Sequence, residues 1–278
     1  MLVDKPAGLT SHDVVHRLRR VLGTRAVGHT GTLDPFATGL LVVLVGRATR
    51  LARFVEAHVK RYGATARLGW ATDTDDLTGA PLGAPATLEG LTESAVRAAL
   101  QSLVGPQRQR PPRYSAKHVD GERSYRLARR GRAVDPAPVD VVVHQAELLR
   151  FAPPALEFRV TVSAGTYVRA LARDLGERLG IGAHLVALRR EAVGPLSVDD
   201  ATPLDRVTAG SVLPPSAVLG HLPSVELAEQ ERLAVSHGRA VPASTPSGDV
   251  ALLHAGELVA VARAEAGWLR PAVVLGVP

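Results

Sequence analysis

The segment of residues 28–39 is dense in turn-forming residues and carries one carboxylate, Asp34, directly before Pro35. Glycine permits backbone angles that other residues avoid, and proline holds the preceding residue in an extended conformation. We therefore expect Asp34 on a stiff, bent loop ahead of the apolar run at residues 40–45. A carboxylate held in this way can act as a nucleophile or as a base, although an aspartate beside a proline is more often only part of a turn.

A second position with chemical potential is Arg169, which ends the run Gly165-Thr166-Tyr167-Val168-Arg169. Apolar residues repeat at helical spacing from Val168 onward, and Thr166 is expected to cap this helix, so Arg169 falls in its first turn. A cation there opposes the positive end of the helix dipole, and this favours a carboxylate partner. By sequence position alone, the simplest partner is Asp174 or a solvent ion.

Three further residues have an ordinary structural explanation beside a functional one. Tyr62 lies on the inward side of an expected strand at residues 58–68, where a tyrosine usually belongs to the core. Leu188 is a core residue by the same reasoning, and His29 is by default a loop histidine. Sequence position alone assigns chemistry to none of the three.

The acidic loop at residues 69–79 contains the run Thr72-Asp73-Thr74-Asp75-Asp76 and could be interpreted as a calcium site. It lacks the spaced ligands and closing glutamate of a calcium-binding loop, so we predict no metal here and assign Asp76 no chemical role. The chain has no cysteine, which excludes disulfides, thiolate metal sites and cysteine nucleophiles.

The chain is basic, with a formal net charge of +6, and its arginines are clustered. One cluster follows residue 16, and another occupies residues 108–132, where tyrosines are interleaved. Positive charge beside aromatic rings suits the phosphates and bases of RNA, whereas the simplest alternative is an ordinary solvated surface. The clusters contain Arg17, Arg19, Arg20, Arg25, Arg108, Arg110, Arg113, Lys117, Arg123, Arg126, Arg129, Arg130 and Arg132.

The 278 residues are enough for one large core and a small second domain. A helix is expected at residues 11–22 with Ser11 as its cap. At residues 210–223 the composition changes to proline, serine and short apolar runs, which marks a boundary; a hairpin turn at Ala255-Gly256 is expected beyond it. No apolar run could span a bilayer and no signal peptide is recognisable, so we expect a cytoplasmic protein without membrane contact.

Several of these segments together resemble the TruB family of tRNA pseudouridine synthases. The resemblance rests on the strings DKPAGLTS at residues 4–11, GHTGTLDPFATG at 28–39, KRY at 60–62, QRPPRYSA at 109–116, GTYVR at 165–169 and GAHLVALRR at 182–190. Phe36 stands where the family usually has a smaller aliphatic residue, and the order Lys117-His118 differs from the usual one. The strings occur in family order along nearly the whole chain.

The resemblance implies an enzyme that converts the T-loop uridine of tRNA, conventionally position 55, to pseudouridine without a cofactor or metal. Asp34 would be the essential carboxylate, acting as a nucleophile or as a base toward the ribose. Arg169 would pair with Asp34 and keep it ionised and aimed. Tyr62 would stack on the target base and help to remove its C5 proton.

The resemblance also implies how the RNA is held. Tyr167 and Leu188 would wall the uracil pocket, and His29 would enter the RNA loop where the target base has left the stack. An arm at about residues 105–135 would close over the RNA. Its basic residues are Arg110, Arg113, Lys117 and Arg123.

The implied fold is α+β. A catalytic domain at residues 1–220, built on a mixed, mainly antiparallel sheet flanked by helices, would precede a small β-rich, PUA-like RNA-binding domain at residues 221–278. The expected partner is the T-stem and T-loop of tRNA, and we expect a monomer without an obligatory protein partner. Two alternatives stay open: a synthase that selects uridines through a guide RNA, and a non-catalytic chaperone that refolds tRNA.

Overall fold

The computed structural model describes residues 1–113, 118–119, 122–123, 136–243 and 247–275. Its largest element is a ten-stranded sheet. The strands are β1 (Leu2–Lys5), β2 (Val27–Thr30), β3 (Thr38–Val45), β4 (Lys60–Leu68), β5 (Gly105–Gln109), β8 (Val139–Ala152), β9 (Ala155–Val162), β10 (Ala183–Val193), β11 (Leu196–Ser197) and β12 (Thr202–Pro203). A separate hairpin joins β6 (His118–Val119) to β7 (Glu122–Arg123).

The order across the large sheet is β12-β1-β3-β10-β4-β9-β8-β5, with β2 beside β3 and β11 beside β10. Most neighbouring strands are antiparallel, whereas β10 runs parallel to β3 and β12 runs parallel to β1. The predicted α+β fold with a mixed, mainly antiparallel sheet is thus confirmed. Because β10 pairs with both β3 and β4, it joins the segment after Asp34 to the strand that carries Tyr62.

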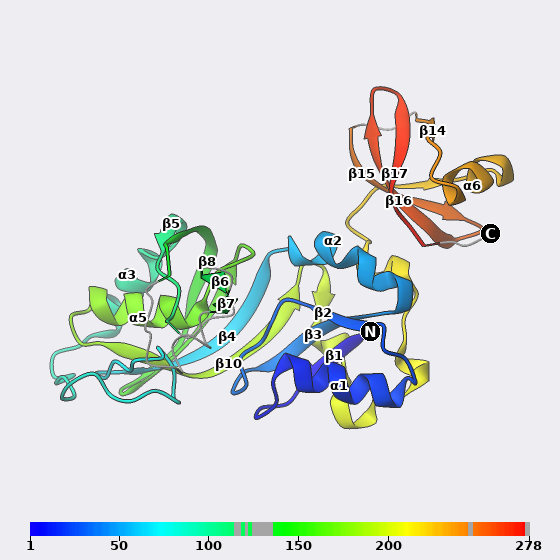
Figure 1. The fold of residues 1–278 in the computed structure, drawn as a ribbon. Helices are drawn as coiled ribbons and strands as arrows, with labels where there is room; N and C mark the ends of the chain where they lie inside the picture. Colours follow the sequence, from blue (N-terminus) through cyan, green and yellow to red (C-terminus); the bar gives the residue numbers. More distant parts are fainter. Residues whose placement is uncertain (114–117, 120–121, 124–135, 244–246, 276–278) are drawn as a thin grey trace.

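Helices cover the large sheet at both ends (Figure 1). At one end, α3 (Glu93–Gln101) and α5 (Val168–Arg178) bury Leu100, Leu171 and Leu175 against β4, β8 and β9. At the other end, α1 (Ser11–Val21) buries Val14 and Leu18 against β1 and β3. Shorter turns are η1 (Gly46–Leu51), α2 (Ala52–Glu56), η2 (Val198–Asp200), η3 (Leu204–Arg206), η4 (Ala209–Ser211) and η5 (Pro215–Val218). None of the described helices has the length and apolar character needed to cross a membrane.

Two of the predicted helix caps are wrong by one residue. Thr10, not Ser11, caps α1, because its side chain accepts a hydrogen bond from the backbone of Asp13 while the Asp13 carboxylate accepts one from the backbone of Thr10. Tyr167, not Thr166, stands at the cap position of α5. The Thr166 hydroxyl instead donates to the carbonyl of Ser163, 3.0 Å away.

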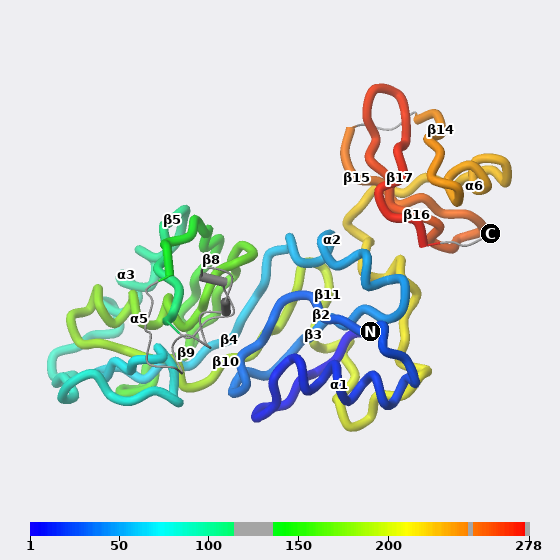
Figure 2. Tube along the Cα trace, in the orientation of Figure 1, coloured from blue at the N-terminus to red at the C-terminus, as the bar shows by residue number. Residues whose placement is uncertain are grey.

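Residues after 223 form a second, smaller sheet that lies beyond α2 and carries the C-terminus (Figure 2). Its order is β13-β15-β16-β17-β14, and α6 (Glu229–Ser236) packs on it. The strands are β13 (Ser224–Glu226), β14 (Val241–Pro242), β15 (Gly248–His254), β16 (Glu257–Glu265) and β17 (Trp268–Val274). The predicted turn at Ala255-Gly256 joins β15 to β16, with both residues at positive φ, and is confirmed.

The small sheet is attached to the large one through an apolar contact and two hydrogen bonds. Val261 and Leu275 belong to the same buried cluster as Leu51. The guanidinium groups of Arg47 and Arg50 donate to the carbonyls that end β17, at 3.1 and 2.7 Å. The two sheets therefore form one packed body.

Candidate active site

A cavity of about 470 Å³ opens where the loop after β2 meets β4, β10 and the start of α5. Segments far apart in sequence converge here because β3, β10 and β4 are neighbours in the large sheet. Six residues predicted to act on the substrate line this cavity: His29, Asp34, Tyr62, Tyr167, Arg169 and Leu188.

The loop that carries Asp34 is bent and anchored on both sides. The carbonyl of Asp34 accepts a hydrogen bond from the backbone of Ala37, and the carbonyl of Pro35 accepts one from Gly8. Gly39 has a φ of +100°, and a Cβ there would overlap the backbone of Arg190, so this position requires glycine. The predicted stiff loop around Asp34 is confirmed.

A buried lysine lies behind the loop. The Lys5 ammonium donates to the carbonyls of Pro6, Leu9 and Pro35, which ties the leader segment to the loop. Burial lowers the pKa of Lys5 to about 8, while the Asp34 carboxylate opposes this shift.

The Arg169 guanidinium faces the Asp34 carboxylate edge to edge. Nε lies 3.0 Å from Oδ2, and Nη2 donates to Oδ1 at 3.0 Å. Two parallel contacts of this kind fix both the distance and the orientation of a carboxylate. The Arg169 side chain is 5% exposed, whereas that of Asp34 is 32% exposed toward the cavity. The carboxylate can therefore meet a bound molecule while its partner stays inside the fold.

Arg169 is held from behind by the acidic loop between β4 and α3. Its Nη1 lies 3.2 Å from Oδ2 of Asp76 and donates to the carbonyl of Thr74 at 3.0 Å. The Asp76 carboxylate also accepts hydrogen bonds from the hydroxyl groups of Thr74 and Thr78. The sequence assigned Asp76 no chemistry and did not predict this contact, through which Asp76 helps to fix Arg169.

The surroundings of Asp34 shift its pKa in opposite directions. Burial raises the pKa of the Asp34 carboxyl above its ordinary value; the Arg169 guanidinium opposes this effect, and the charge of Asp76 adds to it. Arg169 is thus the neighbour that most opposes the raised pKa of Asp34.

The cavity walls come from three elements. Tyr62 lies on β4 opposite Val160 of β9 and is 7% exposed, and Leu188 on β10 is also 7% exposed. Tyr167 precedes α5, and its backbone forms two hydrogen bonds with the side-chain amide of Gln109. An aromatic and aliphatic pocket beside an oriented carboxylate can hold a flat ring next to a reactive oxygen.

Comparison with known proteins shows the family to which this chain belongs. The sequence model of the TruB family pseudouridylate synthase (N terminal domain) matches residues 19–168, and that of the tRNA pseudouridylate synthase B C-terminal domain matches residues 169–213. The tRNA pseudouridine synthase B of Thermobifida fusca is 46% identical, covering 99% of this chain and 97% of its own. That of Gloeobacter violaceus is 45% identical, with 98% and 97% covered. This chain belongs to the TruB family.

Two solved structures share the fold across almost the whole chain. The structure of an H/ACA RNP bound to a substrate RNA containing 2'-deoxyuridine contains a chain that is 25% identical, with a TM-score of 0.73. A Cbf5-Nop10-Gar1 complex contains one that is 28% identical, with a TM-score of 0.74. Each match covers 99% of this chain and 83% of the other.

For this TruB family member, sequence reasoning missed several contributors to the site. Asp76 was recognisable as one acid of an acidic loop, but its partner lies 93 residues away. Gln109 opens the string QRPPRYSA, and its buried amide satisfies the backbone of Tyr167. Lys60 and Arg190 are buried cations that also line the cavity.

Lys60 and Arg190 are held by backbone carbonyls. Lys60 donates to the carbonyls of Glu56 and His58, and burial lowers its pKa to about 8. Arg190 donates to the carbonyls of Leu40 and Gly31. Arg190 thereby helps to fix the loop between β2 and β3 on the sheet, whereas Lys60 holds the segment that leads from α2 into β4.

Arg110 and Arg113, two of the residues predicted for the RNA-binding arm, do not line the cavity. Arg110 extends from the end of β5 to α5, where its Nη2 is 3.5 Å from Glu177 and its carbonyl accepts a hydrogen bond from Arg173. Arg113 closely follows, and Arg123 lies in β7. Lys117 is outside the described residues. In the part of the chain that the structure describes, no three His, Asp or Glu side chains are grouped as metal ligands would be.

Proposed function

We propose that this chain isomerises the T-loop uridine of tRNA, at position 55, to pseudouridine. The observation that carries the proposal is the double contact between Arg169 and Asp34 on the wall of a cavity that also contains Tyr62 and Leu188. A carboxylate aimed into a pocket of ring size is what cleavage and re-formation of a bond to a nucleobase requires. The family and the tRNA pseudouridine synthase relatives support the choice of reaction and of RNA.

The reaction breaks the bond between N1 and C1′ and forms a bond between C5 and C1′. Asp34 acts either by attacking the ribose or by removing a proton from it, and both routes need the ionised carboxylate that Arg169 favours. After the detached uracil turns and rejoins, the C5 proton is lost and N1 gains one. Substrate and product contain the same atoms, so the reaction consumes no co-reactant.

The other cavity residues that the sequence predicted to act on the substrate each have a task in this scheme. Tyr62 stacks on the base and assists removal of the C5 proton, while Tyr167 and Leu188 keep the detached uracil from escaping. His29, which also lines the cavity, fills the place of the flipped base in the RNA stack. The arm binds the RNA backbone through Arg110, Arg113, Lys117 and Arg123.

We assign the catalytic work to residues 1–220, and residues 221–278 to a PUA-like domain that adds RNA contacts. The chain would act as a monomer in the cytoplasm on the T-stem and T-loop of bare tRNA. The tRNA synthase relatives are 45–46% identical to it, whereas the structural relatives seen with Nop10 and Gar1 or in an H/ACA RNP are 25–28% identical. This difference favours tRNA as substrate over a guide-dependent reaction.

The test is to incubate the pure protein with unmodified tRNA that carries tritium at uracil C5. We expect release of about one tritium per tRNA, mapped to position 55, without added protein, guide RNA or metal. Release mapped to another position would overturn the choice of substrate. Binding without any release would favour the chaperone alternative.

A further inference from the structure

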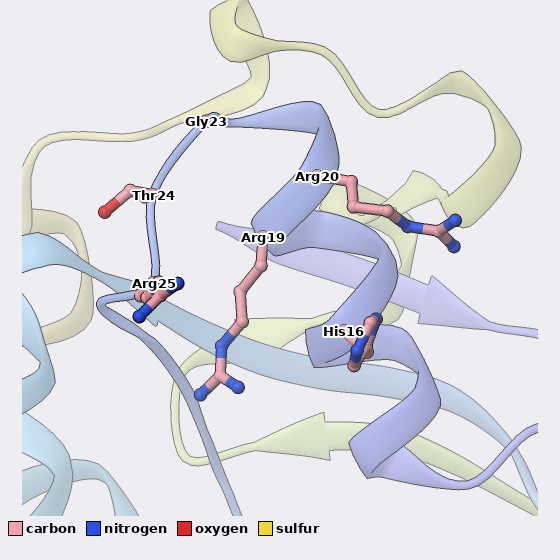
Figure 3. Close-up of a pocket in the computed structure, with 6 residues that line it drawn as sticks. All are labelled: His16, Arg19, Arg20, Gly23, Thr24 and Arg25. Atoms are coloured by element: carbon pink, nitrogen blue, oxygen red, sulfur yellow. The ribbon is translucent and has the colours of Figure 1, made fainter.

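A basic surface cavity of about 420 Å³ lies at the end of α1, apart from the catalytic cavity. It is formed by the last turn of the helix and the turn that leads into β2 (Figure 3). The lining residues are His16, Arg19, Arg20, Gly23, Thr24 and Arg25. Arginine at a helix C-terminus is compatible with the helix dipole, so the fold accepts this charge there.

The arginines of this cavity form no ion pair with an acidic side chain of the described residues. Among the described residues, no carboxylate lies within ion-pairing distance of Arg19, Arg20 or Arg25. Arg19 donates from Nη2 to the carbonyl of Val27 at 3.1 Å, but its buried Nε has no acceptor. The acid of α1, Asp13, is engaged by Thr10 at the opposite end of the helix. The positive charge is therefore free to meet an anion.

Helix α1 connects this cavity to the loop that carries Asp34 through hydrogen bonds near both of its ends. At the start of α1, the Ser11 hydroxyl exchanges two hydrogen bonds with the backbone of Leu33, next to Asp34. At the end of α1, Arg19 contacts Val27, the first residue of the strand that carries His29. Arg25 precedes His29 by four residues, which corresponds to about 13 Å of extended chain. Such a distance spans only a few nucleotides of an RNA strand.

The directions of the side chains indicate the kind of anion. In Figure 3 the Arg19 side chain runs toward the segment that follows Arg25, whereas the Arg20 side chain extends away from that segment on another side of the helix. Groups that diverge cannot converge on one small phosphate. They can contact successive phosphates of an extended backbone, and the guanidinium fork suits each of these.

We propose that the cavity at the end of α1 is a phosphate-binding subsite for the RNA backbone that flanks the target uridine. The inference rests on the proposed function for the identity of the RNA. The subsite positions the backbone close to His29 while the base occupies the cavity beside Asp34. It is separate from the arm and from the small terminal domain.

The experiment compares tRNA binding by the double variant Arg20→Ala/Arg25→Ala with binding by Arg97→Ala/Arg150→Ala. The control pair removes the same charge from exposed sites on α3 and β8. For the first variant we expect affinity for an unmodified tRNA transcript to fall about tenfold at 0.1 M salt. The slope of log affinity against log salt concentration should become shallower by the contribution of about two phosphate contacts. The control should lose neither, and Arg20→Lys/Arg25→Lys should recover most of the affinity.

Urea unfolding midpoints equal to wild type would establish that both double variants are folded. Equal losses in both double variants, or an unchanged salt dependence in the first, would overturn the subsite. Unchanged tRNA affinity with lost binding to vesicles containing phosphatidylserine would also overturn it, in favour of a membrane surface. Failure of the proposed function would appear differently, as absence of tritium release by the wild-type protein.

Discussion

Arg169 and Arg173 lie one turn apart on α5, and both reach the acidic loop after β4, yet they hold different partners. Arg169 contacts the carboxylates of Asp34 and Asp76, at 3.0 and 3.2 Å. Arg173 contacts Asp75 at 2.8 Å and its neighbour Asp174 at 2.7 Å. Arg169 lines the catalytic cavity, and Arg173 does not.

The difference arises in two consecutive residues of the loop. Asp75 has a φ of +61°, a conformation that aspartate tolerates better than most residues, and the carboxylates of Asp75 and Asp76 reach different arginines. Both pairs fasten the loop to α5, but only the pair with Asp76 continues to Asp34. We therefore expect the two buried ion pairs to serve different ends, one for stability alone and one also for chemistry.

Among variants of the two ion pairs, the largest effect is expected from Arg169→Met. The Asp34 carboxylate would lose its orienting partner and the charge that opposes its raised pKa, so the single-turnover rate should fall about a thousandfold. Arg169→Lys should recover little of this, because an ammonium cannot form the double contact. Rapid-quench measurement of tritium release at saturating enzyme tests both variants. A rate within a few-fold of wild type for Arg169→Met would show that the pair is only structural.

A smaller loss is expected from Asp76→Asn. The amide keeps most of the hydrogen bonds but not the charge that holds Arg169, so misplacement of Asp34 should lower the single-turnover rate by about tenfold to a hundredfold. Asp75→Asn is the matched control, since it changes the adjacent acid that pairs with Arg173. Equal rates for the two variants would remove the distinction between the pairs.

Arg173→Met should act mainly on stability. Loss of one partner leaves Asp75 buried without a counter-charge, which should reduce the free energy of unfolding by about 3 kcal/mol. Urea denaturation gives this value, and tritium release on the folded fraction should stay close to wild type. A large loss of rate in fully folded protein would mean that Arg173 also serves the chemistry.

The smallest expected effect is a change in the pH profile. Burial raises the pKa of Asp34, so the single-turnover rate should fall as the pH is lowered. The fall should begin at a higher pH than the pKa of an ordinary carboxyl group, about 4, would give. The charge of Asp76 adds to that raised pKa, so Asp76→Asn should move this limb to lower pH. Rates measured from pH 4 to 8 test the sign. A limb that moves to higher pH would show that loss of Arg169 alignment dominates.

Periodicity and turn chemistry predicted α1, β4 and the start of α5 to within a few residues, but not the long strands β8 and β10. The resemblance to the TruB family predicted the contact between Arg169 and Asp34. The cap of α1 was wrong by one residue because neighbouring hydroxyl groups can each cap a helix, and a tertiary contact decides between them. Ser11 is engaged by Leu33, which leaves Thr10 for the cap.

Other parts of the site depend on information that local sequence lacks. The contact between Asp76 and Arg169 exists because an irregular loop returns to α5, and no periodic pattern encodes such a path. The basic cluster after residue 16 was visible in the sequence. The structure was needed to show that no described carboxylate pairs with Arg19, Arg20 or Arg25, and that the nearby Asp13 is bound in the cap of α1.

The most direct test of the central claim is the single-turnover rate of Asp34→Asn on tritiated tRNA, measured together with its tRNA affinity. The substitution keeps the shape of the side chain but removes a carboxylate that can attack the ribose or accept its proton. We expect the rate to fall about ten-thousandfold or more while affinity is unchanged or slightly higher. Substantial single-turnover activity, with contaminating wild-type enzyme excluded, would contradict the assignment of Asp34 as the catalytic carboxylate.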